Sequence, residues 1–570
     1  MKCLSLLCVL LASVVGCFSL DREAFTFTKY DLDVQIEPEQ QRLAVRGSLV
    51  LRNDSSTPQK NATLQISSSL TWRSIQADGK PLQFVSQPYV SDIDHTGELS
   101  EAIVTLPKEV PTGSAVELTI GYEGVIVLDT TRLTRIGLPK EAAIHSDWDQ
   151  IGRLCSAVRG VGNVAWYPVS LDAANLSEGN SLFETLGRWK QRELKAEMKV
   201  QLMYSTPDAQ ASPRLVCNGK NLRAADTAGS TGSVRMDCSL TALGLDAPSF
   251  VLADYQIFER PALQIAYRAE HKSNAEKFAQ AADTATPFVS EWFGAPRGKA
   301  QVVELFDPGA SPFETGPMLM TPLGDTDPKV LEVALVHELT HAAFPSNRPW
   351  IYEGLAHFAE ATYQERQENR QAALDFMGLH YSAVVAAEKA VASRPKDATE
   401  ESLITTSVDE FSRSKAAYVW WMLRDMIGEE ALKKALASYR AEQDNDAGYV
   451  QRLVEAQAKR DLQWFFDDWV YHQHGLPDFR VETAFPRKAS QDNYLVTVTV
   501  ENQGSAGAEV PVTVRFDGGQ MTGRVEVRAK AKGVVRVSTP KPPTQIIVND
   551  GSVPESDMSN HVFKVESGTM

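Results

Sequence analysis

The stretch that decides the fold reads His337-Glu338-Leu339-Thr340-His341. Residues four apart lie on one face of an α-helix, so the two imidazoles can meet a single metal ion. Glu338 lies beside that face, where a water bound to the metal would sit. Asp327 can cap the helix, and Pro328 suits its first position. The pattern predicts a helical metal site; the alternative is an ordinary helix with two core or surface histidines.

A second predicted helix, downstream of the two histidines, carries a carboxylate that could be the third metal ligand. It reads Trp350-Ile351-Tyr352-Glu353-Gly354-Leu355-Ala356-His357-Phe358-Ala359-Glu360, and Glu360 follows His341 after eighteen intervening residues. A catalytic zinc site uses three protein ligands and keeps one position open. We therefore predict one Zn²⁺ per chain, held by His337, His341 and Glu360, with Glu338 as the general base.

Together these motifs resemble the M1 family of zinc aminopeptidases, which belongs to the gluzincins. The resemblance consists of the His-Glu-x-x-His motif, the eighteen-residue spacing and a block of the form Trp-x-x-Glu-Gly-x-Ala-x-x-x-Glu, matched at Trp350, Glu353, Gly354, Ala356 and Glu360. It covers residues 24–478 and is sharpest over 310–430. It implies a saddle-like N-terminal β-domain, a mainly helical thermolysin-like catalytic domain, and peptide substrates that lose their N-terminal residue.

The residues that would select the substrate depart from the family pattern. In the family, a Gly-x-Met-Glu-Asn segment precedes the histidines, and its Glu binds the α-amine of the substrate. The nearest segment here, 309–318, contains Glu314, which could take that role or be an ordinary loop carboxylate. Where the family has a tyrosine that binds the oxyanion, this chain has Arg413, which could stabilise an oxyanion or lie on the surface. Tyr418 lies five residues further on and is a weaker substitute.

Two more residues of the second helix share a face with Glu360. Glu353 lies seven residues before it, where a carboxylate could orient a ligating histidine. His357 lies three residues before it and either lines the metal pocket or is a satisfied helix histidine.

The predicted activity is zinc-dependent hydrolysis of peptide bonds, of the aminopeptidase type, with water activated by Glu338. Two alternatives stay open. A zinc endopeptidase or another hydrolase could use the same scaffold. A weakly active or non-catalytic M1-like binding protein would keep the body without efficient turnover. The altered Gly-x-Met-Glu-Asn segment and the missing tyrosine favour this last alternative, whereas the intact Glu338 opposes it.

The predicted fold class is multidomain α+β. Alternating apolar and polar residues between turn clusters predict an N-terminal β-saddle or sandwich over residues 24–255. Helical patterns dominate the predicted catalytic domain, 256–475, and strands return in a small C-terminal Ig-like β-sandwich, 476–550. Residues 1–20 read as an export signal, and residues 551–570 are polar and predicted to form a flexible tail.

Composition and charge narrow the class of partner. The chain of 570 residues is 43% hydrophobic and 23% charged, which is typical of a soluble globular protein with several domains. Its formal net charge is −16. Because nucleic-acid binding needs a basic face, nucleic acid is excluded as the expected partner.

The N-terminus predicts export. Lys2 precedes an apolar run, Leu4–Val15, that is too short to span a bilayer as a mature helix, and no later segment is long and apolar enough to do so. The sequence Val14-Val15-Gly16-Cys17 resembles a lipobox. The protein is therefore expected either as a lipid-anchored form attached at Cys17, or as a freely exported form in the periplasm or outside the cell.

Beyond the predicted signal, three cysteines remain: Cys155, Cys217 and Cys238. Export permits a disulfide, and Cys217 and Cys238 lie near one another in a region that reads as strands. A bond between them is one possibility, and two separate thiols are the other.

Overall fold

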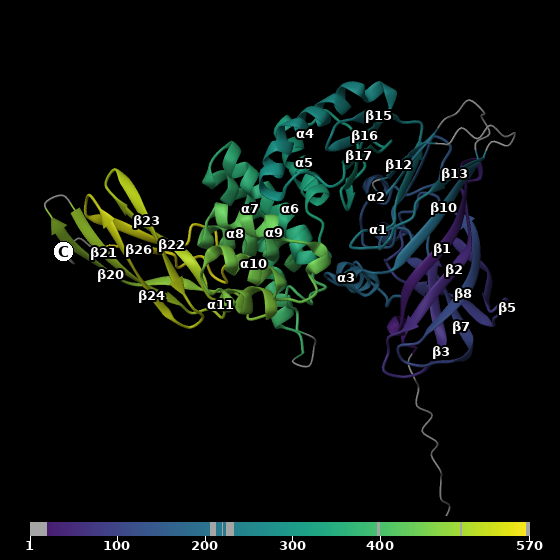
Figure 1. Ribbon diagram of the computed structural model, residues 1–570, viewed down its shortest axis with the longest axis horizontal. Helices are drawn as coiled ribbons and strands as arrows, with labels where there is room; N and C mark the ends of the chain where they lie inside the picture. The colour runs from purple at the N-terminus through teal and green to yellow at the C-terminus, as the bar shows by residue number, and fades with distance from the viewer. Residues whose placement is uncertain are drawn as a thin grey trace, which may run out of the picture.

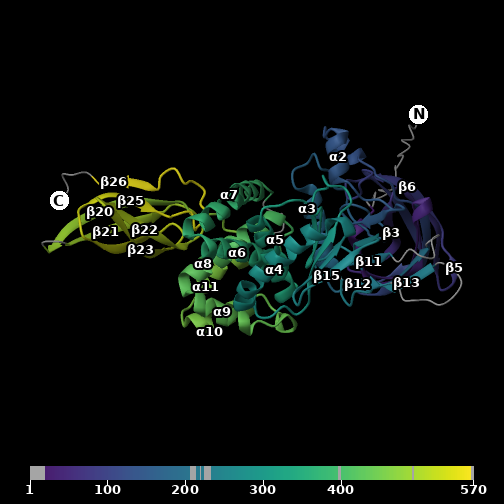
Figure 2. The same cartoon turned by 90° about the horizontal axis from the view of Figure 1, so that it is seen from above.

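The computed structural model places three bodies in chain order along an elongated molecule: a β-rich body, a helical body and a second β-rich body (Figures 1 and 2). This confirms the predicted multidomain α+β fold class. The structure describes residues 20–205, 213–218, 220–223, 233–395, 400–490 and 493–565. Residues 1–19 of the predicted export signal, Cys17 included, lie outside the described residues. Within those described ranges, no helix has the length and apolar character needed to cross a membrane.

Three sheets build the N-terminal body. Their strand orders are β13-β10-β1-β2-β8-β4-β5, β3-β7-β6 and β12-β11-β14-β9. Side chains of β1 alternate between the core and the outer face, as Tyr30 and Leu32 are fully buried while Asp31 is half-buried and Asp33 is exposed. The elements are β1 (Phe25–Glu37), β2 (Arg42–Asn53), β3 (Gln59–Ser67), β4 (Leu70–Ala77), β5 (Lys80–Pro81), β6 (Phe84–Val90), β7 (Glu98–Val110), β8 (Ala115–Val125), α1 (Thr131–Arg135), α2 (Lys140–Ser146), β9 (Cys155–Val158), α3 (Ser181–Glu193), β10 (Glu197–Ser205), β11 (Arg214–Cys217), β12 (Lys220–Arg223), β13 (Ser233–Asp237) and β14 (Phe250–Ala253).

The helical body begins with a five-stranded sheet of order β15-β16-β17-β19-β18, against which α4 packs (Figure 1). Its remaining helices follow in sequence, and α5, α7, η4 and α8 pack against α6. The elements are β15 (Gln256–Glu259), β16 (Leu263–Tyr267), α4 (Lys272–Phe293), β17 (Ala300–Glu304), β18 (Phe313–Thr315), β19 (Met318–Thr321), α5 (Pro328–Ala343), α6 (Pro349–Gln367), α7 (Arg370–Ala392), the π-helical turn η4 (Phe411–Lys415), α8 (Ala416–Ile427), α9 (Glu429–Ser438), α10 (Tyr449–Ala458) and α11 (Gln463–Phe466).

Both helices that carry the predicted metal ligands begin as their sequences require. The Asp327 carboxylate accepts a hydrogen bond from the backbone N–H of Lys329 at 2.8 Å, and Pro328 occupies the first turn of α5. This confirms the predicted cap. Pro349 opens α6 in the same way. The register of both helices is therefore fixed at their N-termini.

Helix α6 packs very closely on η4 and α8, and Gly354 makes this possible. A Cβ atom at Gly354 would lie 2.6 Å from the Cβ of Ala416. On the same side, the rings of Trp350 and Trp420 stack with centroids 5.0 Å apart, and both are buried. Trp350 and Gly354 of the Trp-x-x-Glu-Gly block therefore set the distance between α6 and α8.

The C-terminal body is a sandwich of two sheets, with orders β20-β21-β24 and β23-β22-β25-β26. Its strands are β20 (Phe479–Ser490), β21 (Asn493–Asn502), β22 (Ala508–Phe516), β23 (Gly519–Val527), β24 (Lys532–Thr539), β25 (Pro543–Val548) and β26 (Val562–Lys564).

The prediction of a flexible tail from residue 551 is wrong over residues 551–565. There β26 pairs with β25, and Glu555 is fully buried, where it accepts a hydrogen bond from the backbone N–H of Phe479 at 2.6 Å. His561 is also buried, with its Nε2 2.9 Å from Glu555. Ser552, Glu555 and His561 of this segment are buried polar residues, so polarity alone misidentified it. Residues 566–570 lie outside the described residues.

The two cysteines considered for a disulfide lie at different strands: one ends a strand, and the other follows a strand of another sheet. Cys217 ends β11, whereas Cys238 follows β13, and both are buried. No disulfide joins this described pair.

We predict that Gly354→Ala destabilises the protein, because the added methyl group has to displace Ala416, the first residue of α8, and presses on the Trp420 ring. Such overpacking costs about 1–3 kcal/mol of unfolding free energy. Thermal and denaturant unfolding of the purified variant measure this cost. Gly378→Ala in α7 is the matched control, since nothing lies within 4 Å of its added Cβ and alanine favours a helix by about 1 kcal/mol. Equal stability of the two variants would contradict the close-packing argument.

Candidate metal centre

The two histidines of α5 converge as their spacing predicts. Their Nε2 atoms lie 3.0 Å apart, and both residues are buried, with 5% and 4% of their surface exposed. A third group meets them from another element. Glu314, on the short edge strand β18, places Oε1 3.0 Å from the Nε2 of His337 and 3.0 Å from the Nε2 of His341. One carboxylate oxygen therefore faces both nitrogens that the sequence identifies as metal ligands.

Glu360, the predicted third ligand, approaches His337 from the other side of the ring. Its Oε2 lies 3.4 Å from the Nδ1 of His337 and 2.7 Å from the Nδ1 of His357. The possible ligand atoms thus form two groups that share His337. One group comprises Glu314, His337, His341 and Glu353; the other comprises His337, His357 and Glu360.

These residues fit a zinc ion by their chemistry. Imidazole nitrogens and carboxylate oxygens are the usual zinc ligands besides thiolates. Within each group the candidate atoms all lie within 4.8 Å of one another. Two buried atoms beside them, Glu338 Oε2 and His341 Nδ1, have no hydrogen-bond partner within the described chain. Such unpaired polar atoms are costly in an interior that lacks a ligand.

The carboxylates of the centre differ in the direction of their pKa shifts. Burial, reinforced by the charge of Glu314, raises the pKa of Glu338 well above its ordinary value. Burial also disfavours charge on Glu314 and Glu360, but the neighbouring imidazoles outweigh it and hold the pKa of both carboxyls below the usual range. Glu338 is therefore the carboxylate suited to take up a proton, and the other two are suited to stay ionised.

Arg413 reaches the centre from the π-helical turn η4. Its Nε donates to the Nε2 of His357 at 3.2 Å and lies 3.8 Å from Glu353 Oε2, and 42% of its side chain is exposed. π-Helical turns often occur at functional sites, because the extra residue redirects a side chain. Arg413 therefore lies beside the centre, with part of its side chain at the surface.

Tyr418 does not reach the metal centre. It is 1% exposed, and its hydroxyl donates to the backbone carbonyl of Met377 at 2.9 Å. This corrects the expectation that Tyr418 substitutes for the tyrosine of the family. The physical reason is that five residues along α8 turn the side chain into the core beneath α7.

A cleft of about 520 Å³ lies between the N-terminal and helical bodies, and Glu314 and Glu353, which face the metal centre, are among its lining residues. Part of its wall is charged and includes Glu314, Glu353 and Arg413. Another part is apolar and comes largely from α3, with the lining residues Leu176, Leu182, Phe183 and Leu186. A large apolar side chain such as Phe183 is 52% exposed there, which is typical of a ligand-binding surface.

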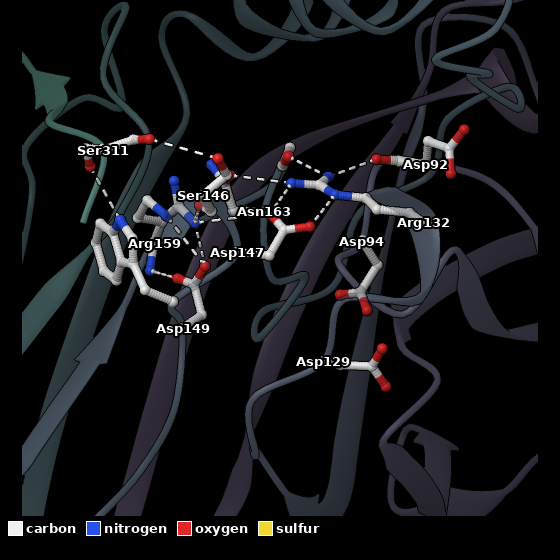
Figure 3. A network of polar contacts seen from close by, with 12 residues as sticks. Asp92, Asp94, Asp129, Arg132, Ser146, Asp147, Asp149, Arg159, Asn163 and Ser311 are labelled. Carbon is white, nitrogen blue, oxygen red and sulfur yellow. Dashed lines mark hydrogen bonds and ion pairs between the residues drawn. The ribbon is translucent and has the colours of Figure 1, made fainter. Parts of the chain in front are cut away.

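Figure 3 shows a buried polar network on the N-terminal side of this cleft. Arg159 Nη2 bonds Asp149 Oδ2 at 2.6 Å. The neighbouring Trp148 donates its indole N–H to the carbonyl of Ser311 at 3.0 Å. Ser311 lies just before β18. The Trp148–Ser311 hydrogen bond therefore ties the strand that carries Glu314 to the N-terminal body. Sequence analysis missed this network, since the two segments are far apart in the chain and share no motif.

Asp246 is a further cleft residue that no sequence pattern marks. It lies in an irregular segment between β13 and β14, and an added Cβ at Gly316 would come within 2.7 Å of its carboxylate. Burial raises the pKa of Asp246 to about 6. It adds a third carboxylate to the charged part of the cleft wall.

The sequence matches no known family model and no curated protein. Among solved structures, the chain resembles M1 zinc metallopeptidases. A mutant of the enzyme from Deinococcus radiodurans aligns at 16% identity and a TM-score of 0.45, over 79% of this chain and 95% of that one. The same mutant bound to a Tyr-Ser-Ala substrate aligns at 16% and 0.45, over 80% and 96%. The M1 zinc metallopeptidase from this organism aligns at 16% and 0.44, over 76% and 91%.

We predict that Tyr418→Phe leaves catalysis within about twofold, because the lost hydroxyl bonds a backbone carbonyl in the core; the cost is about 1 kcal/mol of stability. Steady-state kinetics and thermal unfolding check both parts. Tyr381→Phe is a matched control, since the Tyr381 hydroxyl also donates to a backbone carbonyl, that of Glu555, at 2.9 Å. A loss of about 100- to 1000-fold in kcat on Tyr418→Phe would restore the oxyanion role.

Proposed function

We propose that this chain is a zinc-dependent peptidase of the aminopeptidase type. The observation that carries the proposal is the convergence of the His337 and His341 Nε2 atoms, 3.0 Å apart and buried, beside Glu338 and at the side of a large cleft. His337, His341 and Glu360 would hold the metal. Bound zinc supplies Lewis-acid chemistry, polarising the scissile carbonyl and acidifying a water molecule.

Glu338 performs the proton transfers of the reaction. It is 2% exposed, and its Oε2 has no partner among the described residues, so the oxygen is available to a water molecule. Burial and the neighbouring carboxylates raise the pKa of Glu338, which favours transfer of a proton from that water to its carboxylate. It then delivers the proton to the nitrogen of the leaving amine.

The charged wall of the cleft supports recognition of a free amino group. Glu314, Glu353 and Asp246 line the cleft near the histidines, so a substrate ammonium placed there would meet carboxylates from three elements. Arg413 lines the same wall and would donate to the carbonyl oxygen of the substrate as charge develops on it. The apolar wall from α3 would contact the residues that follow the scissile bond.

Glu338→Gln should abolish turnover and leave zinc in place. Glutamine keeps the size and hydrogen-bonding capacity of the side chain but cannot accept the proton, so we expect a loss of about 10²- to 10⁴-fold in kcat. Zinc content by mass spectrometry and kcat on aminoacyl fluorogenic peptides are the two measurements. Glu332→Gln, on the same helix, is the control, because the Glu332 carboxylate lies outside the metal centre and accepts a hydrogen bond from the Tyr363 hydroxyl at 2.6 Å. Full activity of Glu338→Gln would refute the assignment.

The free-amine requirement is tested by pairing each peptide with its N-acetylated form. We expect cleavage of the free form alone, and Glu314→Gln should raise KM for it about 10- to 100-fold, because a hydrogen bond to a charged group is lost. Equal cleavage of both forms would favour a zinc endopeptidase. Zinc binding with no cleavage of either form would favour an M1-like binding protein.

A further inference from the structure

We infer that His357, oriented by Arg413, is a positioning residue that holds Glu360 in place for the metal. The inference rests on the proposed metal site, but it concerns residues outside the three predicted ligands and Glu338. His357 matches no conserved letter of the Trp-x-x-Glu-Gly block, so it is a feature of this chain's own sequence.

The first observation is the contact between His357 and Glu360. The two residues lie one helical turn apart on α6, and the Nδ1 of His357 is 2.7 Å from Glu360 Oε2. Their side chains are only 10% and 12% exposed, so water does not compete strongly for this bond. A carboxylate with one oxygen held in this way keeps its other oxygen in a defined direction.

The second observation fixes which nitrogen of His357 carries the proton. An arginine N–H can only donate, and the Nε of Arg413 donates to His357 Nε2 at 3.2 Å. Nε2 therefore acts as the acceptor, and the proton lies on Nδ1. That proton points at Glu360 Oε2, so the chain of donors runs from Arg413 through His357 to the carboxylate.

The third observation is that Arg413 is itself held. Its Nη1 lies 3.5 Å from Asp409 Oδ2, and its Nε lies 3.8 Å from Glu353 Oε2. Helix α6 packs against η4, which brings the guanidinium within reach of His357. Partners of this kind behind a metal ligand typically change metal affinity by about 10- to 100-fold when they are removed.

The test measures zinc affinity by competition with a chromophoric chelator, using purified metal-free protein and added zinc. We expect His357→Phe to raise the zinc Kd about 10- to 100-fold. His357→Asn should restore it to near the wild-type value, because the asparagine Nδ2 stands where the Nδ1 donor stood. His380→Phe is the control: its ring lies 4.9 Å from that of His357, but its Nδ1 bonds Ser414 Oγ at 2.9 Å.

A double-mutant cycle tests whether the two residues act in series. Arg413→Met should weaken zinc binding, and adding it to His357→Phe should cause no further loss, since the tautomer no longer matters once the imidazole is gone. A merely structural role for His357 would give independent, additive losses and no rescue by asparagine.

The outcomes separate this inference from the proposed function. An unchanged zinc Kd in folded His357→Phe, or an asparagine variant as weak as the phenylalanine variant, overturns the positioning role alone. Failure of the wild-type protein to bind zinc overturns both. If His357→Phe does not fold, as judged by thermal unfolding, His357→Leu replaces it with the same expected Kd.

Discussion

The centre of this protein is governed by one electrostatic constraint: carboxylates gather round two imidazoles in a largely dry interior. Glu314, Glu338, Glu353 and Glu360 all act on His337 or on one another there. Among the described residues, Arg413 is the fixed cation on which these charges act. Gathering negative charge away from water is costly unless a cation offsets it. A divalent ion bound by the histidines meets this need, and the same excess of negative charge would attract the ammonium group of a peptide.

Three elements within residues 313–367 meet this constraint together. The edge strand β18 supplies Glu314, α5 supplies the histidines and Glu338, and α6 supplies Glu353 and Glu360. Two of them are held by contacts outside the centre: Trp148 of the N-terminal body bonds the segment before β18, and Gly354 lets α6 approach α8. A change at these remote contacts would therefore move a charged side chain within the centre.

The features predicted correctly from the sequence are those that depend only on residues close together in the chain. The spacing of His337 and His341 on one helical turn, and the cap at Asp327, depend only on neighbours in sequence, and both are present. The position of Glu314 against both Nε2 atoms was not predictable, because β18 reaches the site through pairing with β19 and through packing of the N-terminal body. Tyr418 was misplaced for the same reason: its direction is decided by packing against α7, which a linear motif does not contain.

The most direct test of the account is a crystal structure of the zinc-loaded protein with anomalous diffraction collected at the zinc edge. We predict one strong anomalous peak, within bonding distance of His337, His341 and a Glu360 oxygen, with Glu314 facing the cleft. Absence of a peak in protein soaked with zinc, or a peak ligated without His337 and His341, would contradict it.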